Sequence, residues 1–152
     1  MTDNNPIRDR RLAWYATILL TVTYTFSFID RQIVNLLIEP IQADLLLSDT
    51  QISFLQGLAF VVPYLLFSVP IGRVVDTFSR IKVLIGGIIF WSAACIYCGL
   101  SKNVIQLTIG RMGVGAGEAS VTPAAWSLLA DYFPEDKRGL PVSIFLMGPY
   151  LG

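Results

Sequence analysis

Four charged side chains lie inside long apolar stretches of the sequence, where a water-exposed surface does not explain them. Asp30 and Arg31 are adjacent in one stretch, and Arg111 and Glu118 lie seven residues apart in another. Carboxylates and guanidinium groups form ion pairs, bind ionic substrates and, for the carboxylates, exchange protons. The sequence contains no histidine, so any proton chemistry must use Asp, Glu, Tyr or Lys.

Glu118 is expected near the middle of its apolar stretch. Removal from water favours the protonated form of a carboxylate, so Glu118 would bind a proton near neutral pH unless Arg31 or Arg111 keeps it ionised. A permanent structural ion pair is the alternative. In a helix, Arg111 and Glu118 would be about 10.5 Å apart along the axis, which is too far for a pair within the helix. Each therefore needs a partner elsewhere, and we expect Asp30 to pair with Arg111.

Polar residues also follow one side of the stretch that contains Asp30. At 100° per residue most of them fall within one half-turn of Asp30, which predicts a face on an aqueous cavity. The alternative is a shorter helix whose wet outer end carries Asp30 and Arg31. The residues on this side are Thr17, Thr21, Thr23, Tyr24, Ser27, Arg31 and Asn35.

The elements that must position these residues are membrane-spanning helices. The 152 residues are 54% hydrophobic and 14% charged, whereas about 25% of an average soluble domain is charged. A span needs about 20 apolar residues, and its backbone must satisfy its own hydrogen bonds, which favours helices. We expect an all-α, polytopic bundle with residues 1–11 as a tail. The predicted helices are 13–38, 52–75, 83–100 and 104–130, with a fifth at 141–152 that is too short to cross.

Positively charged residues alternate between the connections of these helices. Eight of them lie in the tail and in the second and fourth connections, against Lys102 alone in the first and third. By the positive-inside rule, we expect a multi-pass protein of the cell (inner or plasma) membrane with a cytoplasmic N-terminus. The eight residues are Arg8, Arg10, Arg11, Arg73, Arg80, Lys82, Lys137 and Arg138.

Two further patterns concern packing and excluded chemistry. Gly113 and Gly117 form a G-x-x-x-G, which allows another helix backbone to approach closely. Cys95 and Cys98 lie deep in an apolar run, which favours packed, inert thiols over a redox or zinc site. Acidic and basic residues are equal at 11 each, and no nucleophile–base pair or metal-ligand set is present. We therefore expect no enzymatic activity, no cofactor, no metal and no nucleic-acid partner.

Several motifs resemble those of the major facilitator superfamily. The chain carries Gly72-x-x-x-Asp76-x-x-x-Arg80, Asp131-x-x-Pro134-x-x-x-Arg138 and Arg111-x-x-x-Gly115-x-Gly117-Glu118-Ala119. Together with "FIDRQ", "FWSA" and "RMGVGAGEAS", these are most similar to the Spinster-like branch. Thr77, Ser79 and Ile81 depart from the first motif, where the family has a base, Gly or Asn, and a base.

The resemblance implies a secondary transporter that works by alternating access between two six-helix halves. The chain would then be a partial N-terminal half, and the missing C-terminal half would be its partner, together with membrane lipids and a small-molecule or lipid-like substrate. Asp30 and Glu118 would be proton-coupling residues with Arg111 as their partner, if transport is proton-coupled. A cytoplasmic clamp would consist of Gly72, Asp76, Arg80, Asp131 and Arg138.

Two other functions fit the same residues. The first is an organic-anion symporter of the same superfamily, in which Arg31 or Arg111 pairs with a substrate carboxylate. The second is a non-transporting membrane scaffold whose buried charges only pair helices. For the transporter, we expect the cavity to be lined by Asp30, Arg31, Arg111, Glu118, Tyr24, Ser27 and Asn35.

Overall fold

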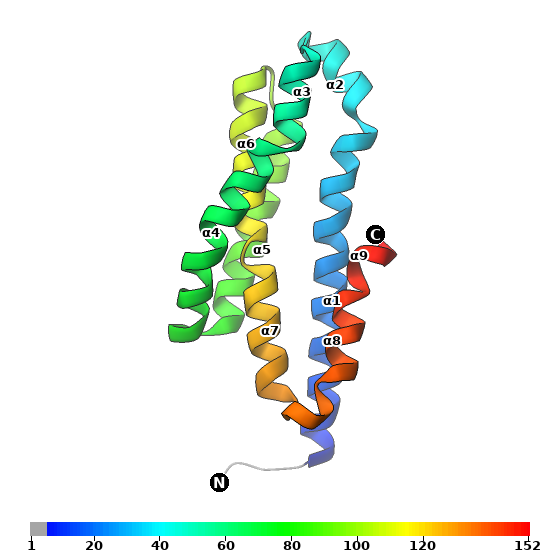
Figure 1. Cartoon of the computed structure of the whole chain (residues 1–152), viewed down its shortest axis with the longest axis vertical. Helices are drawn as coiled ribbons and strands as arrows, with labels where there is room; N and C mark the ends of the chain where they lie inside the picture. Colours follow the sequence, from blue (N-terminus) through cyan, green and yellow to red (C-terminus); the bar gives the residue numbers. More distant parts are fainter. Residues whose placement is uncertain (1–5) are drawn as a thin grey trace. The chain divides into compact units, whose positions relative to one another are not determined.

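The computed structural model describes residues 6–152, with side chains from residue 10 onward (Figure 1). Residues 1–5 of the predicted tail, and the side chain of Arg8, lie outside the described part. Every regular element between residues 6 and 152 is a helix, so the prediction of an all-α fold is confirmed. Three helical segments of this range are long and apolar enough to cross a membrane. They are Arg10–Leu36, Asp49–Thr77 and Arg80–Gly99.

The chain divides into two compact units, and each is described by itself. Unit 1 comprises Met1–Ile29 and Ala125–Gly152, and unit 2 comprises Asp30–Ala124. Unit 1 contains the first part of α1 and the last part of α7, followed by a short 3-10 turn, η1, and two short helices. The bounds are Pro6–Leu36 for α1, Val121–Tyr132 for α7, Glu135–Lys137 for η1, Gly139–Leu146 for α8 and Gly148–Leu151 for α9.

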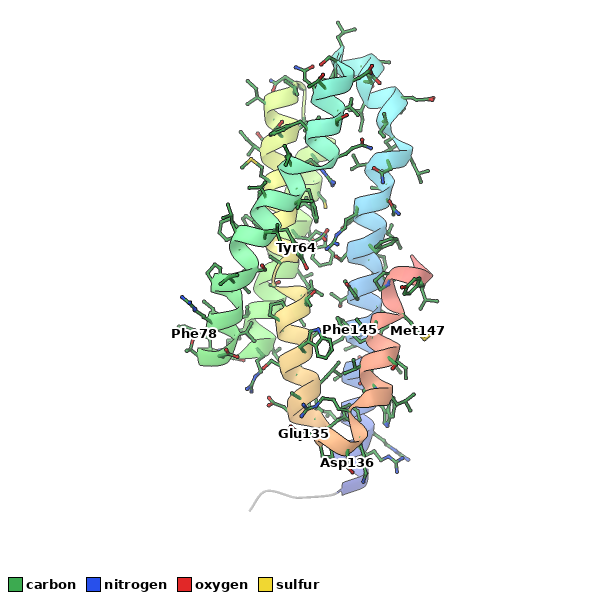
Figure 2. All side chains as sticks on the ribbon, viewed as in Figure 1. Tyr64, Phe78, Glu135, Asp136, Phe145 and Met147 are labelled. Carbon is green, nitrogen blue, oxygen red and sulfur yellow. The ribbon has the colours of Figure 1, made fainter. Side chains whose placement is uncertain are left out.

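Aromatic contacts and one close backbone approach hold unit 1 together. Figure 1 shows α8 beside the first part of α1, and the ring of Phe145, labelled in Figure 2, stacks on Tyr24 at 4.8 Å between centroids. A Cβ atom on Gly148 would lie 3.0 Å from the carbonyl oxygen of Thr21, so only glycine fits here without a shift. The hydroxyl of Thr25 donates to the Gly148 carbonyl at 3.1 Å.

Unit 2 is a bundle in which α6 packs against both α4 and α5 (Figure 1). Phe78, labelled in Figure 2, lies at the turn between α4 and α5. Beyond Asp30 the unit contains the end of α1 and five further helices before the start of α7. They are α2 Ile38–Leu45, α3 Asp49–Gln56, α4 Leu58–Thr77, α5 Arg80–Gly99 and α6 Val104–Glu118.

Glycines bring the backbones of unit 2 close together. A Cβ atom on Gly117 would lie 2.7 Å from the Cβ and 2.8 Å from the backbone nitrogen of Trp91 on α5. A Cβ atom on Gly113 would lie 3.0 Å from the Cβ of Ala94, which is also on α5. Gly115 faces α4 instead, where its added Cβ would overlap the carbonyl oxygen of Phe60. Three glycines on α6 therefore allow it to approach two neighbours at once.

The helices are interrupted where continuous spans were predicted. The predicted helix 104–130 is divided into α6 and α7. The predicted helix 13–38 corresponds to α1, which begins earlier, at Pro6, and ends at Leu36. Leu37 separates α1 from α2, which lies mainly in the connection predicted after residue 38. Proline explains both interruptions, because it has no N–H to donate to the carbonyl four residues earlier. Pro40 leaves the carbonyl of Leu36 without that bond, and Pro123 leaves the carbonyl of Ala119 without it.

The predicted helix 52–75 is also divided, at Gly57, which separates α3 from α4. The start of α3 has a strong local signal, because Ser48 and Gln51 form a reciprocal capping box. Pro63 and Pro70, where the sequence predicts bends, both lie inside α4. The predicted fifth helix consists of α8 and α9, and Pro149 lies in the first turn of α9.

Candidate functional site

A buried ion pair joins α1 to α6 within unit 2. Arg31 Nε donates to Glu118 Oε2 at 2.8 Å. The side chain of Glu118 is 0% exposed, whereas that of Arg31 is 29% exposed. The two residues are 87 positions apart in the sequence. Because both charges lie in apolar helices, each stabilises the other where water does not.

Aromatic rings of α4 cover the guanidinium of Arg31. Its Cζ atom lies 4.9 Å from the ring centre of Phe60 and 5.1 Å from that of Tyr64. The two rings stack on each other with centroids 5.9 Å apart, and Figure 2 labels Tyr64 on α4. Arg111 lies over the same Phe60 ring, at 5.3 Å. A cation over a ring face is stabilised electrostatically, so Phe60 serves two guanidinium groups.

Asp30 bonds to α5. Its Oδ2 atom accepts a hydrogen bond from Trp91 Nε1 at 2.5 Å and a weaker one from Cys95 Sγ at 3.7 Å. Cys95 and Cys98 are both free thiols. No group of three or more potential metal ligands lies close together within the described residues.

The predicted pairing of Asp30 with Arg111 is wrong. No ion pair between them occurs in the described part of the chain, because Asp30 bonds to donors of α5 instead. Arg111 is only 4% exposed, and its Nε atom is buried without a hydrogen-bond partner among the described residues. A buried guanidinium nitrogen without an acceptor is costly, so this group has the capacity to bind an anion or to exchange partners.

A cavity of about 430 Å³ adjoins these groups within unit 2. Asp30, Cys95 and Arg111 lie in its wall, and most of the remaining lining is aliphatic. Such a lining suits a solute that is polar at one point and apolar elsewhere.

The other predicted cavity residues have local partners. Asn35 donates to Gln32 at 2.7 Å and accepts from Gln56 at 2.8 Å. Tyr24 and Ser27 belong to unit 1, where Tyr24 stacks on Phe145 and Ser27 is buried. Three threonines of the polar face, and Thr25 outside it, donate to the carbonyl four residues earlier on the same helix, which satisfies their hydroxyls within an apolar helix. They are Thr17, Thr21, Thr23 and Thr25.

The residues of the predicted clamp lie at helix ends. Asp76 is exposed in the last turn of α4 and forms no ion pair with a described residue. Arg80 is the first residue of α5, and Gly72 has open space where a Cβ would lie. Arg138 donates to the carbonyls of Ala130 and Phe133, at 3.0 and 3.2 Å. It thereby caps the end of α7 with a cation, where the helix dipole is negative. Asp131 is exposed at the same helix end.

Sequence reasoning missed three residues of this site: Phe60, Tyr64 and Trp91. For Trp91 a signal was present, because an indole N–H inside an apolar helix needs an acceptor. The two rings of α4 carried no such signal, because an aromatic residue in a membrane helix usually packs against other apolar groups.

Long apolar helices that carry a buried ion pair and further buried charges define a polytopic membrane protein with a polar interior, as transporters have. Residues 20–152 match the Major Facilitator Superfamily profile, and the chain belongs to that family. Its members are transporters, not enzymes.

Individual relatives support this assignment. The chain is 33% identical over 143 residues to an MFS-type efflux pump of Mycolicibacterium smegmatis, covering 94% of this chain and 33% of the pump. It is 28% identical to a probable L-galactonate transporter of Escherichia coli (95% and 32% covered). It is 29% identical to the sphingosine-1-phosphate transporter SPNS2 of Xenopus tropicalis (94% and 28% covered).

The fold has a close solved counterpart. A bacterial homolog of the human lysosomal transporter Spinster, in an inward-facing and unoccupied conformation, superimposes with a TM-score of 0.87 at 36% identity. The match covers 90% of this chain and 29% of that structure. The resemblance to Spinster-type transporters is thereby confirmed. The chain spans about a third of the length of the curated relatives that it matches.

Proposed function

We propose that the protein moves a small or amphipathic organic solute across the cell membrane by alternating access, coupled to protons through Asp30 and Glu118. The observation that carries this proposal is the Arg31–Glu118 pair, whose carboxylate is fully buried. A buried carboxylate with one charged partner has two stable conditions: ionised and paired, or neutral after it binds a proton. A change between the two alters the link between α1 and α6.

The two carboxylates have separate environments. Glu118 bonds to a cation, whereas Asp30 bonds to a neutral indole and a thiol. Partners of such different kinds suit separate roles for the two carboxylates in the proposed coupling. The clamp residues Gly72, Asp76, Arg80, Asp131 and Arg138 are proposed to secure the cytoplasmic side, together with the remainder of the transporter.

A second candidate is the symport of an organic anion. Arg111 favours it, because its buried Nε atom lies in a cavity wall without an acceptor among the described residues. Two relatives carry names for sugar-acid transport, L-galactonate and galactarate or D-glucarate, and one is named for a lipid phosphate. All these solutes bear the anionic group that a guanidinium binds in a bidentate manner.

The test is solute-dependent proton movement by the protein from its complete gene, reconstituted in vesicles. A panel of L-galactonate, D-glucarate, sphingosine-1-phosphate and lincomycin samples the classes that the relatives' names indicate. We expect one member to cause a pH change in the vesicle lumen, and Glu118→Gln to abolish that change. Uptake without proton movement would refute the coupling. Full activity of both Asp30→Asn and Glu118→Gln would favour a purely structural role for these charges.

A further inference from the structure

We infer that Trp91 is a positioning residue for Asp30, whose carboxylate it holds on α5 through the indole N–H. The inference rests on the proposed function, in which Asp30 takes part in proton coupling. It assigns a positioning role to a neutral side chain of α5.

The contact is specific in atoms and in geometry. Trp91 Nε1 donates to Asp30 Oδ2, and this is the shortest polar contact of the carboxylate. Trp91 is 4% exposed, so its indole N–H is buried at this contact. The indole nitrogen can donate a hydrogen bond but cannot accept one, so Trp91 is always the donor and the Asp30 carboxylate the acceptor.

Close packing of α6 against the backbone of Trp91 fixes the position of this residue. Gly117 leaves room for the backbone of Trp91, since any side chain there would meet its Cβ and its nitrogen at 2.7 and 2.8 Å. Gly117 directly precedes Glu118, so the residue that seats Trp91 neighbours the other carboxylate of the site. The same short segment of α6 therefore sets the positions of both proton-binding groups.

The charged groups near Asp30 do not replace this bond. Arg31 donates to Glu118, and Arg111 lies over Phe60 without an ion pair to Asp30 in the described chain. Cys95 contributes only a weak contact, and the cavity wall adds Cys98 of α5 and Asp44 of α2. Among the described residues, loss of the indole N–H would thus leave the carboxylate with a thiol at 3.7 Å as its sole hydrogen-bond donor.

The test compares Trp91→Phe with Trp126→Phe in the protein from its complete gene. Trp126 is 43% exposed on α7, belongs to unit 1, and provides the same chemical change. A carboxylate that loses an N–H donor is protonated at higher pH. We expect the midpoint of the uptake-against-pH curve to move by about one pH unit to higher pH in Trp91→Phe, a tenfold change in proton affinity. An unchanged midpoint, or a move to lower pH, would overturn the inference.

A double mutant separates action through Asp30 from a general packing effect. Trp91→Phe is expected to have no further effect on the pH curve in an Asp30→Asn background. An equal shift with and without the carboxylate would show that Trp91 acts elsewhere.

A second measurement needs neither transport nor the folding of Trp91→Phe. The indole N–H signal of Trp91 is first assigned in the ¹⁵N-labelled protein from the complete gene, where Trp14→Phe and Trp126→Phe identify two of the other indole signals. The Trp91 signal should follow pH in the wild type and lose this response in Asp30→Asn. A Trp91 chemical shift that changes neither with pH nor with the Asp30→Asn substitution would refute the inference. If the signal behaves as expected but no solute moves protons, the proposed function fails while the positioning by Trp91 stands.

Discussion

At the scale of single residues, Arg31 is the most connected charged group of the site. It donates to Glu118 from α1 and lies over two aromatic rings of α4. Lysine would be a poor replacement, because a guanidinium combines planar hydrogen bonding with stacking on ring faces. Removing one member of a buried pair costs more than removing both, because the remaining charge has no counterion.

We therefore predict that Arg31→Gln lowers the free energy of unfolding by about 3 kcal/mol, near the lower end for buried pairs because Arg31 remains partly exposed. The double variant Arg31→Gln with Glu118→Gln should recover most of this loss. Equilibrium unfolding in mixed detergent micelles measures both values. A double variant as unstable as the sum of the two single variants would contradict the prediction.

Glu118→Gln separates coupling from solute movement. Glutamine keeps the shape and can still accept from Arg31, but it cannot exchange a proton. Uptake driven by a pH gradient should fall by about a hundredfold, the scale of a lost proton-transfer group. Exchange of labelled for unlabelled solute at equal pH should be partly retained. Vesicle assays of the two modes side by side measure the difference, and equal loss in both would argue against a coupling role.

At the scale of elements, α6 acts as the central contact of unit 2. Its glycines face α5 at Gly113 and Gly117 and α4 at Gly115. Without a hydrophobic driving force between helices in lipid, such close packing supplies much of their association. The interruption that follows Glu118 lies at the end of this contact, where Pro123 removes a backbone hydrogen bond.

Gly117→Ala should therefore destabilise the bundle by about 1–3 kcal/mol, the usual cost of overpacking. The backbone of Trp91 cannot yield in the way that a flexible side chain does. The matched control is Gly86→Ala, because a Cβ on Gly86 meets nothing within 4 Å. Thermal unfolding in detergent should show a loss for the first variant only. Gly113→Leu should likewise reduce assembly, and normal folding and abundance of either variant would refute the prediction.

At the scale of the whole molecule, orientation in the membrane is the property most open to a direct test. The alternation of positive charges predicts that Asp136 is cytoplasmic and Thr50 is extracellular. Both residues are exposed, and Figure 2 labels Asp136 in η1, after α7.

Cysteine labelling checks this orientation in intact cells. Cys95, Cys98 and any further cysteine of the protein from its complete gene are first replaced by serine, and single cysteines are then placed at positions 50 and 136. A membrane-impermeant maleimide should label Thr50→Cys directly, but Asp136→Cys only after permeabilisation. The reverse pattern would invert the predicted topology.

The sequence predicted the helical fold because apolar runs of sufficient length have few other structures available in lipid. It did not predict α2 or the interruption before Val121. Hydropathy indicates neither of them, because the cause is a single missing N–H, at Pro40 and at Pro123. Proline itself is not a sufficient signal, because Pro63 and Pro70 lie inside one helix.

The members of the site were easier to predict than their partners. Asp30, Arg31, Arg111 and Glu118 stand out because charge inside an apolar run is expensive. Their pairing depends on how α1, α4, α5 and α6 rotate against each other, which periodicity within one helix does not determine. The assignment of Asp30 to Arg111 failed for this reason, since the donor that reaches Asp30 is on α5.

The two rings beneath Arg31 have a consequence for the energy of proton uptake. When Glu118 becomes neutral, the guanidinium loses its counterion but keeps the electron-rich faces of Phe60 and Tyr64. The cation is therefore not stranded in an apolar medium at the moment when the salt link opens. Under the proposed coupling, neutralisation of the carboxyl group would therefore open the salt link without disrupting the bundle, and the step could be reversed.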